Sequence, residues 1–457
     1  MAPVIPAASE TQIDPVASFL ETVQEGDVSR IEESLDGLTA SDQVRALLNM
    51  GADDQEKLLH LVDPKLAADV VEELPQERAA EIIERLDAKT AASILEEMDS
   101  ADQADVFSEM HDAEAEAIYS EMAPDAAEDV RKLAEYPSDT AGGLMSTDVF
   151  TFVETETVGT ILRRVASEDE DFERYRGQHP YILDAEGRLV GVVSLRTLIT
   201  SKRSVPLKDV MVAPLSVSPL TELGDLEDVF DDYPFLGIPV VDEAGRMIGT
   251  VSRTAVSDAS LHRAEDDALK MQGVVGDEIR SMPTLLRARR RLSWLTVNIG
   301  LNIVAASVIA LYEETLTAVI ALAVFLPIVS DMSGCSGNQA VAVTMRELSL
   351  GLARPVDIVK VWLKEITVGA INGLVLGILI GLAAWAWRGN AWIGVVVGVA
   401  LAVNTLVAVS IGGTVPLALK RFNVDPAVAS GPMLTTITDM VGFFLVLSLA
   451  SAMLPLL

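Results

Sequence analysis

Five long apolar segments occupy the C-terminal part of the chain, separated by short polar stretches. They cover about residues 292–312, 316–344, 366–387, 392–419 and 431–457. A helix rises about 1.5 Å per residue, so each segment can cross a hydrocarbon core of about 30 Å. Trp385, Trp387 and Trp392 fall where an aromatic belt would anchor helix ends at the membrane surface. The pattern therefore predicts five transmembrane helices.

Basic residues between the apolar segments predict their orientation. They cluster before the first segment, after the second and after the fourth, at Arg287, Arg289, Arg290, Arg291, Arg346, Arg354, Lys360, Lys364, Lys420 and Arg421. The opposite connections carry Glu313, Glu314 and a single Arg388. Because basic loops stay on the cytoplasmic side, we expect cytoplasmic N-terminal domains and an outer C-terminus. The expected location is the plasma (bacterial inner) membrane.

Two places within these segments break the apolar pattern. Pro327 to Gln339 reads PIVSDMSGCSGNQ, which is too polar and glycine-rich for a straight lipid-facing helix. It predicts either unwound backbone beside a water-filled cavity or a kink packed on neighbouring helices. The fifth segment contains Asp439 in TTITDMVGFF. A carboxylate there costs about 2.5–3.5 kcal/mol on insertion scales, so it indicates an ion path, with a structural capping residue as the alternative.

The chemistry of these positions fits a hard cation. Carboxylate, amide, hydroxyl and carbonyl oxygens are the ligands that Mg²⁺ and Ca²⁺ prefer. One carboxylate per chain suffices if two chains place it around a shared axis and a Mg²⁺ ion keeps its waters. We therefore expect a homodimer with Asp439 on the ion path. The other expected lining and bend residues are Pro327, Gly334, Gly337, Asn338, Gln339, Thr435 and Thr436.

A 12-residue repeat organises the stretch from Leu58 to Glu135. Apolar residues recur at Val62, Leu74, Leu86, Met98, Met110 and Met122, mostly followed by Asp or Pro. Each unit is predicted to be a short amphipathic helix ended by a turn, and stacked units bury their apolar faces. The repeat predicts a small acidic helical solenoid. It is either a regulatory, ion-sensing arm or simply a solvated acidic surface.

A second repeat follows at an offset of 58 residues. ILDAEGRLVGVVS at Ile182–Ser194 matches VVDEAGRMIGTVS at Val240–Ser252, and each copy is predicted to be a β-hairpin with a D-x-x-G turn. The pattern resembles a tandem pair of CBS domains, regulatory α/β modules that often bind adenosine nucleotides. The copies end in SLRTL and SRTAV, without the aspartate that would hold a ribose. A bound nucleotide is therefore not expected.

Charge divides the chain at the same place as hydropathy. The net charge is −34, but residues 292–457 hold only 7 of the 34 basic and 8 of the 68 acidic residues. The first 291 residues therefore carry 27 basic and 60 acidic residues, a balance of −33. This argues against nucleic acid as a partner, because a phosphate backbone requires a basic face. A single cysteine excludes an internal disulfide, and the four histidines fall in no catalytic motif, so no enzyme is expected.

The order of these parts resembles the MgtE-type magnesium channels over nearly the whole chain after about residue 20. The resemblance rests on the acidic repeat, on YPSDTAGGLM at the start of the first CBS copy, and on three motifs of the membrane part. These motifs are GNQ at Gly337–Gln339, WLKE at Trp362–Glu365 and DPAVASGPMLTTITDMVG at Asp425–Gly442. The chain departs from the usual family residues at Asp331, Cys335 and Gly431.

The resemblance implies a homodimer in membrane lipid with a central pore, where Asp439 binds a largely hydrated Mg²⁺. It also implies a cytoplasmic Mg²⁺ sensor and a plug helix that closes the pore. The implied sensor residues are Asp258, Asp266, Asp267, Asp102 and Asp105. Mg²⁺ is thus expected both as the transported and as the regulatory ion.

The expected fold is a multidomain α-helical membrane protein: a cytoplasmic α-helical solenoid, an α/β tandem CBS pair and five transmembrane helices. The expected boundaries are a disordered N-terminus at 1–20, the acidic helical repeat at 21–136, CBS domains at 137–203 and 204–262, a connecting plug helix at 263–291, and the pore domain at 292–457.

Three functions are compatible with this organisation. The leading hypothesis is a Mg²⁺-selective channel gated by cytoplasmic Mg²⁺, with Co²⁺ or another divalent ion left open. The second is a proton- or Na⁺-coupled divalent cation transporter, which would make flux depend on a proton or Na⁺ gradient. The third is a non-conducting membrane-anchored sensor. Asp439 argues against the third, because a buried charge without a transport role would be costly.

Overall fold

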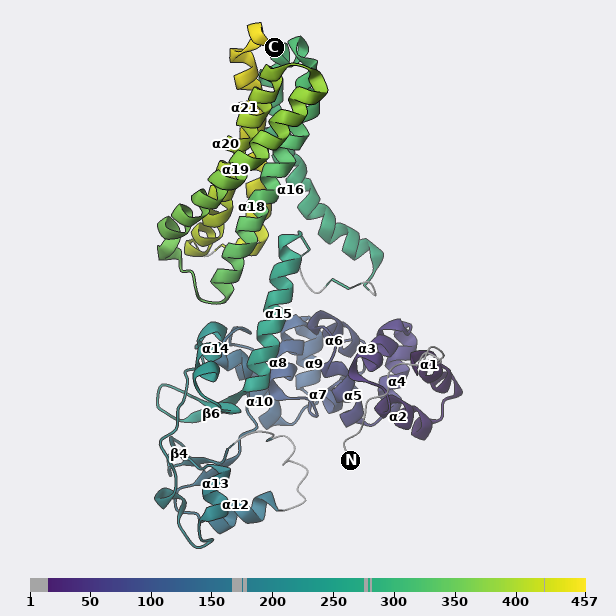
Figure 1. The fold of residues 1–457 in the computed structure, drawn as a ribbon. Coiled ribbons are helices and arrows are strands. Elements are labelled where there is room, and N and C mark those ends of the chain that lie inside the picture. Colours follow the sequence, from purple (N-terminus) through teal and green to yellow (C-terminus); the bar gives the residue numbers. More distant parts are fainter. Residues whose placement is uncertain (1–14, 167–174, 176–178, 275–277, 280–281, 423) are drawn as a thin grey trace, which may run out of the picture. The chain divides into compact units, whose positions relative to one another are not determined.

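The computed structural model describes residues 15–166, 175, 179–274, 278–279, 282–422 and 424–457 (Figure 1). The chain forms two compact units, Met1–Leu261 and His262–Leu457. Short helices and two small sheets make up the first unit, and long apolar helices dominate the second (Figure 1). The expected fold class is confirmed.

Short helices stacked in alternation form the N-terminal part of the first unit. They are α1 Pro15–Glu25, α2 Val28–Asp36, α3 Ala40–Asn49, α4 Ala52–Leu61, α5 Pro64–Glu72, α6 Gln76–Ile83, α7 Ala88–Leu95, α8 Ser100–Glu109, α9 Asp112–Tyr119 and α10 Pro124–Leu133. These helices form two rows. Within a row, helices two positions apart in the chain pack on each other, as in α5–α7–α9 and α6–α8–α10 (Figure 1). The expected disorder up to residue 20 is wrong for residues 15–20, because α1 buries Val16 and Phe19. Residues 1–14 lie outside the described residues.

The 12-residue repeat places one apolar side chain in each turn between helices. Val62, Leu74, Leu86, Met98, Met110 and Met122 follow helices α4 to α9 in order, and all are buried. An aspartate after some of these residues caps the next helix: Asp63 accepts from Lys65 N at 3.0 Å, and Asp87 accepts from Lys89 N at 3.1 Å. An apolar anchor and a capping acceptor together fix the turn. The expectation of short helices ended by turns is confirmed.

Glutamates at the same 12-residue interval link helices along each row. Glu72 accepts a hydrogen bond from Asp99 N at 2.8 Å, Glu84 from His111 N at 2.5 Å and Glu96 from Ala123 N at 2.6 Å. Each acceptor lies 27 residues before its donor. The three donors are the residues that immediately precede α8, α9 and α10. These carboxylates therefore satisfy backbone groups at helix starts, where negative charge is favoured.

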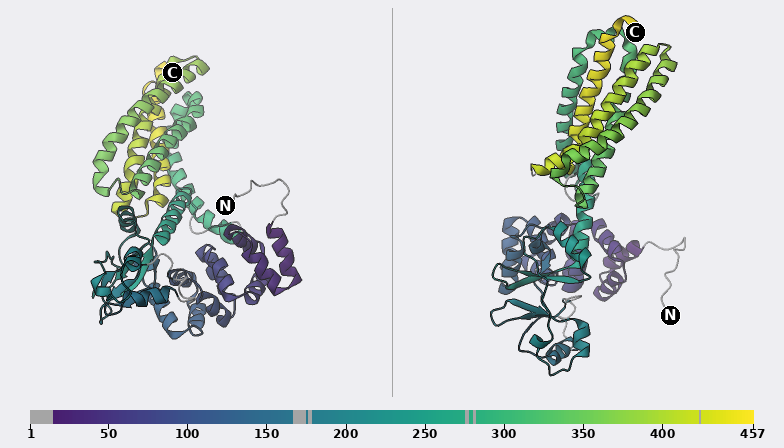
Figure 2. Two further views of the ribbon diagram at one scale, coloured as in Figure 1. Left: turned by 60° about the horizontal axis from the view of Figure 1, so that its bottom comes forward. Right: turned by 60° about the vertical axis from the view of Figure 1, so that its left-hand side comes forward.

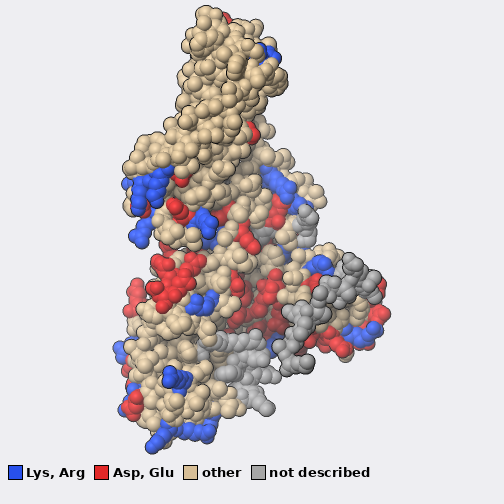
Figure 3. All heavy atoms as spheres, viewed as in Figure 1, with Lys and Arg blue, Asp and Glu red and all other residues tan. Residues whose placement is uncertain are grey.

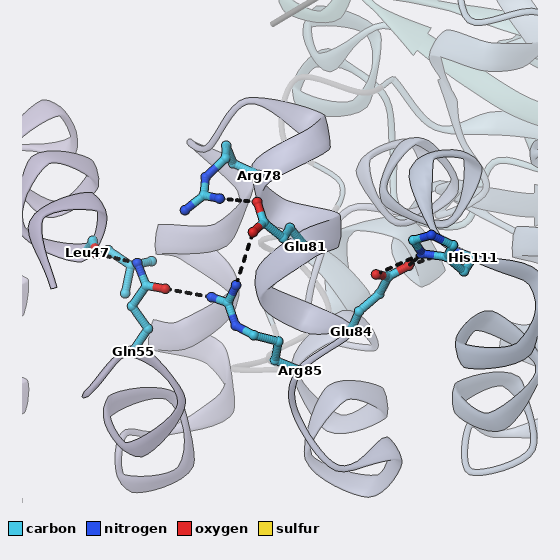
Figure 4. Close-up of polar contacts among 7 residues, drawn as sticks. All are labelled: Leu47, Gln55, Arg78, Glu81, Glu84, Arg85 and His111. Atoms are coloured by element: carbon cyan, nitrogen blue, oxygen red, sulfur yellow. Dashed lines mark hydrogen bonds and ion pairs between the residues drawn. The ribbon is translucent and has the colours of Figure 1, made fainter. Parts of the chain in front are cut away.

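A polar chain inside the array connects α3, α4 and the turn after α6 (Figure 4). Gln55 is buried; its Nε2 donates to Leu47 O at 2.7 Å, and its Oε1 accepts from Arg85 Nη2 at 2.6 Å. Arg85 also contacts Glu81 Oε1 at 3.4 Å, and Glu81 pairs with the buried Arg78. Charge inside this array is thus largely matched by a partner, as burial requires.

Two three-stranded sheets follow, with the orders β1–β6–β5 and β2–β3–β4. The strands are β1 Met145–Ser146, β2 Thr151–Val153, β3 Tyr181–Leu183, β4 Leu189–Val192, β5 Gly237–Val241 and β6 Met247–Ser252. The accompanying helices are α11 Ala141–Leu144, α12 Val158–Val165, α13 Leu195–Thr200, the 3₁₀ turn η2 Leu207–Asp209 and α14 Leu223–Asp232. β2 and β3 are parallel, and the other strand pairs are antiparallel. The two copies exchange a strand, because β1 pairs with β6 of the second copy.

The two D-x-x-G hairpin turns have the same geometry. Asp184 accepts from Arg188 N at 2.9 Å and Arg188 Nε at 2.7 Å; Asp242 accepts from Arg246 N at 2.8 Å and Arg246 Nε at 2.8 Å. The glycine of each turn, Gly187 or Gly245, has a positive φ of 79° or 77°, which L side chains rarely adopt. The turns also pair with each other through Leu189 N and Gly245 O at 3.0 Å. The predicted hairpins are confirmed.

The connector between the CBS pair and the apolar helices is not one helix. α15 Arg253–Met271 ends before Gly273, whose φ is +76°, and α16 begins only at Thr284, after Pro283. α16 then continues without interruption to Leu311, through the first apolar segment. The expected separate plug helix at 263–291 is therefore wrong: its two ends belong to different helices. A glycine in the left-handed conformation ends the first, and proline starts the second.

The remaining elements of the second unit form a helical bundle. They are α17 Glu313–Ala318, η3 Ile320–Val324, α18 Phe325–Ser349, η4 Pro355–Asp357, α19 Ile358–Arg388, α20 Ala391–Arg421, α21 Pro426–Ala452 and η5 Leu454–Leu456. Among the described residues, five helical stretches are long and apolar enough to cross a membrane: Thr284–Leu311, Ile320–Ser349, Pro355–Arg388, Ala391–Arg421 and Gly431–Ala452. α20 is central and packs on α18, α19 and α21 (Figure 2). On the face shown in Figure 3, charged residues are sparse along these helices and gather near their ends.

The stretch Pro327–Gln339 is helical throughout, within α18. The expected unwinding is therefore wrong, and the alternative of a kink packed on neighbouring helices stays a prediction. Pro327 lies in the first turn, where a missing N–H breaks no helical hydrogen bond. Ser330, Ser333, Gly334 and Gly337 are buried against protein, so a regular helix can carry these small residues without exposing them to lipid.

Candidate ion site in the membrane helices

Asp439 lies within α21 and is half-buried between helices. The hydroxyl of Ser330, on α18, donates a hydrogen bond to Asp439 Oδ1. Among the described residues, no Lys or Arg forms an ion pair with this carboxylate. A carboxylate that neutral hydroxyls hold in a membrane helix is suited to a passing cation.

Asn404 on α20 joins α18 and α21 beside this carboxylate. It is fully buried, and its Nδ2 donates to Ser333 Oγ at 2.5 Å and to Thr438 O at 3.0 Å. Ser333 in turn donates to Val329 O at 2.8 Å. Thr438 O belongs to the residue before Asp439. Asn404 therefore fixes the backbone that carries the carboxylate relative to the helix that carries Ser330.

Two oxygen atoms near this network are buried without a hydrogen-bond partner: Asn404 Oδ1 and Thr405 Oγ1. Both side chains are fully buried. An unsatisfied buried polar atom typically costs about 1–3 kcal/mol. The bundle therefore tolerates two unsatisfied buried oxygens on α20, at and next to the residue that joins α18 and α21.

The expected lining residues divide into two groups. Gly334 and Gly337 are buried, and a Cβ at Gly337 would lie 2.8 Å from Leu434 and 3.1 Å from Ala408 O. Gly337 permits close helix packing, whereas a Cβ at Gly334 would meet only Thr438 Oγ1, at 3.9 Å. Pro327, Asn338 and Gln339 are exposed on α18; on α21 Thr435 is exposed and Thr436 half-buried. Both threonine hydroxyls donate to backbone oxygens one turn earlier, at Gly431 and Pro432.

α18 exposes a polar stripe along one side. The stripe runs through Asp331, Cys335, Asn338, Gln339 and Arg346, all exposed at helical spacing. The opposite side of the same helix buries Phe325, Val329, Val341 and Leu348. Polar side chains on a spanning helix face protein or a water-filled cavity, because exposure to lipid is costly. A single chain supplies no such cover for this stripe among the described residues.

Two of the expected sensor residues, Asp102 and Asp105, lie on α8 in an acidic neighbourhood. Burial raises the pKa of Asp102 to about 8, and Glu72 and Asp258 are among the carboxylates that raise it further by repulsion. Burial also raises the pKa of Asp105 to about 6 and that of Glu72 to about 7. Asp258, on α15, is exposed. The first unit thus brings three of the five expected sensor residues, Asp102, Asp105 and Asp258, into one electrostatic neighbourhood.

The other two, Asp266 and Asp267, lie nearer the C-terminal end of α15, in the second unit. Lys270 Nζ lies 3.7 Å from Asp266 Oδ2 and 3.7 Å from Asp425 Oδ2, the latter just before α21. Burial raises the pKa of Asp267, and repulsion from Asp425 adds to the effect. Within the described part of the chain, no group of three or more His, Cys, Asp or Glu side chains has the geometry of a metal site.

Several residues of the site carry little signal in the sequence. Ser330, Ser333 and Asn404 are single polar residues inside apolar segments. A polar residue in an otherwise apolar span is itself a usable signal, and Asn404 stands out in GVALAVNTLVAV. The spacing of residues along the sequence cannot show that Ser330 and Asp439, 109 positions apart, form a hydrogen bond.

Comparisons with known proteins find matches over most of the chain. The family model for MgtE, a divalent cation transporter, matches residues 326–449; the MgtE intracellular N domain matches 38–139; and the CBS domain matches 141–203 and 207–262. The magnesium transporter MgtE of Bacillus subtilis is 31% identical over 324 residues, 71% of each chain. That of Thermus thermophilus is 33% identical over 335 residues, 72% of this chain and 74% of the relative.

A solved structure, the cytosolic domain of the Mg²⁺ channel MgtE in complex with ATP, shares 30% sequence identity with a TM-score of 0.48. It covers 53% of this chain and 99% of that one. The two relatives are each more than 30% identical to this chain, over more than two thirds of this chain and of the relative. The chain therefore belongs to the MgtE family of divalent cation transporters.

Proposed function

We propose that the protein transports Mg²⁺ across the bacterial inner membrane as a channel, with Asp439 as the carboxylate on the ion path. The observation that carries the proposal is Asp439 itself: a carboxylate within a spanning helix, held by Ser330 and without a basic partner in the described helices. The relatives from Bacillus subtilis and Thermus thermophilus are named magnesium transporters, which supports Mg²⁺ as the ion.

The single carboxylate favours a hydrated ion. Mg²⁺ loses its water reluctantly and is often held by one or two carboxylates while several waters remain. The hydroxyls and carbonyls near Asp439 can accept hydrogen bonds from such waters. A fully dehydrated divalent ion would require six or more protein oxygens, which one aspartate and its neighbours do not supply.

The exposed polar stripe of α18 supports a homodimer. Asp331, Asn338 and Gln339 would face lipid in a single chain, at a considerable cost in free energy. A second copy facing the same side of α18 and α21 would convert the stripe into the wall of a hydrated path. Thr435, exposed on α21, would then join that wall, and two copies of Asp439 would share one ion.

Cytoplasmic Mg²⁺ is proposed to gate this path through Asp102, Asp105, Asp258, Asp266 and Asp267. Burial and, to a smaller degree, repulsion from neighbouring carboxylates raise the pKa values of Asp102 and Asp105 to about 8 and about 6. A divalent cation would relieve the same repulsion. The carboxylates are too few in any one place for a closed metal cage, so Mg²⁺ bound through its waters fits best. The N-terminal domains are proposed to be cytoplasmic and the C-terminus external.

Nucleotide binding is not part of the proposal. The ATP in the solved cytosolic domain concerns that protein. In this chain the positions after the second hairpin are Thr254 and Ala255, and α13 begins Leu195–Arg196–Thr197. Neither place offers a carboxylate for a ribose. Addition of ATP is expected to leave Mg²⁺ flux unchanged.

Flux measured in liposomes tests the proposal. The purified chain is reconstituted, and the uptake of Mg²⁺, Ca²⁺ and Co²⁺ is followed while Mg²⁺ on the side of the soluble unit is varied. Mg²⁺ uptake should fall as that Mg²⁺ rises, and Asp102→Asn with Asp258→Asn should weaken this inhibition about tenfold. Asp125→Asn, an exposed acid on α10, is the matched control. Flux indifferent to Mg²⁺ on that side would contradict the gating.

A coupled transporter is the competing function. A coupled transporter would belong to the same family and use the same ion site as the channel. It would differ in that a proton or Na⁺ gradient drives the uptake of Mg²⁺. Collapse of the proton gradient and replacement of Na⁺ by K⁺ distinguish the two. Mg²⁺ uptake driven by voltage and the Mg²⁺ gradient alone supports the channel, whereas uptake that stops without a proton or Na⁺ gradient supports the transporter.

A further inference from the structure

An apolar groove of about 410 Å³ runs along the outer side of α19 and α20. Its rims are formed by large apolar side chains: Leu374, Ile378, Leu382 and Trp385 on α19, and Val395 and Val399 on α20. All six are exposed, from 45% for Val395 and Val399 to 61% for Leu374. The groove is therefore open along its length, and nothing in the described chain covers it.

Glycines form the floor of this groove. A Cβ at Gly377 would lie 2.5 Å from Gly398 O, and a Cβ at Gly394 would lie 2.4 Å from Gly381 O. These distances are too short for any larger residue, so the two backbones are in direct contact. The large apolar side chains of the rims lie on either side of this backbone contact. The depth of the groove thus follows from the glycine spacing of both helices.

The groove has the dimensions of one membrane leaflet. From Leu374 to Trp385 α19 advances 11 residues, about 16 Å at about 1.5 Å per residue. This is roughly half of a hydrocarbon core of about 30 Å. Both helices are long and apolar enough to span a membrane. An acyl chain of one leaflet has the length and the chemistry to lie in the groove.

One end of the groove carries the only positive charge of the region. Between Lys364 and Lys420 the sequence contains a single Lys or Arg, Arg388. Arg388 is three residues after Trp385, so it continues the groove-facing side of α19 where the helix ends at Gly389. It is exposed, and no ion pair links it to an acid of the described chain. Trp392, 44% exposed, follows Ala391, which lines the groove at the start of α20.

We propose that this groove binds an anionic phospholipid, with one acyl chain between α19 and α20 and the headgroup phosphate at Arg388. The guanidinium matches a phosphate in charge and geometry. Trp385 and Trp392 are of the type that lies at the level of lipid headgroups. The polar stripe of α18 is the better surface for a second copy of the chain, because polar residues there require protein or water. The groove has no polar rim residues for that purpose.

Quenching of tryptophan fluorescence by brominated lipid tests the site. The full chain is reconstituted in phosphatidylcholine with a minor fraction of either brominated phosphatidylglycerol or brominated phosphatidylcholine. The Trp385 signal is the difference between the wild type and Trp385→Phe. It should be quenched at least twofold more by the anionic lipid. Arg388→Gln should remove that preference and leave the quenching by phosphatidylcholine unchanged.

A second pair of variants tests the groove itself. Val399→Phe should fill the groove and reduce the Trp385 quenching by either lipid at least twofold. Leu379→Phe is the matched control, since Leu379 is exposed to a similar degree, 59%, on α19 but outside the groove lining. Equal quenching by both lipids in the wild type, or preference that survives Arg388→Gln, overturns the proposal. Oxidative cross-linking of Val399→Cys between two chains, with no Trp385 quenching, would assign the groove to a second copy and also overturn it.

Discussion

The two units of this chain place carboxylates in opposite ways. In the first unit acidic residues are numerous and close together. Repulsion from four carboxylates contributes to the raised pKa of Asp102: Glu72, Asp99, Asp105 and Asp258. In the second unit Asp439 lies within a spanning helix, with the hydroxyl of Ser330 as its hydrogen-bond donor. The first arrangement stores repulsion that a counter-ion can release. In the second arrangement, a carboxylate within the membrane is costly in free energy, so that a passing cation that neutralises it is favoured.

The difference teaches where each carboxylate can act. Water screens most acidic residues of the first unit, so single charges contribute little and only groups respond to an ion. Within the spanning helices screening is weak, so one carboxylate has a large effect. Other acids of the first unit, such as Glu72, Glu84 and Glu96, are already occupied by backbone N–H groups. Acidity alone therefore does not mark an ion site.

Removal of the negative charge of Asp439 should have the largest effect. Asp439→Asn keeps the size of the side chain and the hydrogen bond with Ser330 but removes the negative charge. We expect Mg²⁺ flux in liposomes to fall by about 100-fold or more, equivalent to about 2.7 kcal/mol. Glu313→Gln, an exposed acid on α17, should leave flux within about twofold. Retained flux in Asp439→Asn would place the essential carboxylate elsewhere.

Asn404 should be the next most sensitive position, because it holds α18 and α21 together around Asp439. Asn404→Leu removes hydrogen bonds to Ser333 Oγ and Thr438 O and leaves both buried groups without this donor. We expect a loss of about 2–3 kcal/mol in the free energy of unfolding, measured in detergent by chemical denaturation. Asn302→Leu, on the exposed side of α16, serves as control, since its Nδ2 donates only to Asn298 O of the same helix. Equal stability of the two variants would remove Asn404 from the network.

Protonation of the crowded acids should have a smaller effect with a defined sign. The pKa values of Glu72, Asp102 and Asp105 are raised to about 7, about 8 and about 6, mainly by burial. Between about pH 4, where unfolded carboxyls lose protons, and about pH 8, the folded state binds more protons. The first unit should therefore become less stable as pH rises through this window without Mg²⁺. After allowance for solvent screening, the expected loss is on the order of 1 kcal/mol.

Hydrogen exchange of the α5 and α8 peptides, corrected for intrinsic rates, measures this change. Asp102→Asn should flatten the dependence on pH, because its uncharged amide cannot lose a proton in this range. The α3 peptide is an internal control, since none of these three acids lies on it. Protection of α8 that increases from pH 5 to pH 8 would contradict this sign and hence the raised pKa values of the three carboxyls.

The hydrophobic pattern predicted most of the fold. Segment lengths gave five membrane helices, and the 12-residue and 58-residue repeats gave the helical array and the two hairpins, because these depend on local periodicity and turn chemistry. The prediction of unwound backbone failed at Pro327–Gln339, which is helical, and the prediction of one connecting helix failed after Met271. In the first case tertiary packing overrode local composition. In the second a single glycine with positive φ follows the end of a helix that the family resemblance had implied to continue as a plug helix.

The candidate site was predictable in part. Asp439 is visible in the sequence because a charge in an apolar span is unfavourable without a role. Ser330, Ser333 and Asn404 were not identified, and the assignment of Gly334 and Gly337 to the lining or bend stays a prediction, since both are buried in the single chain. The omissions and this open assignment share one cause. The sequence reports the polarity of a position but not the side of the helix that neighbouring helices cover.

By itself the sequence determined the elements, the division of charge and the identity of the intramembrane acid, since each is a property of composition or of short-range spacing. Only the tertiary structure decided that Ser330 and Asn404, from two other helices, hold the region of Asp439, and that glycines of α19 and α20 create a groove ending at Arg388. The reason is physical: helix periodicity is encoded within a few residues, whereas contacts between helices depend on packing across more than a hundred positions.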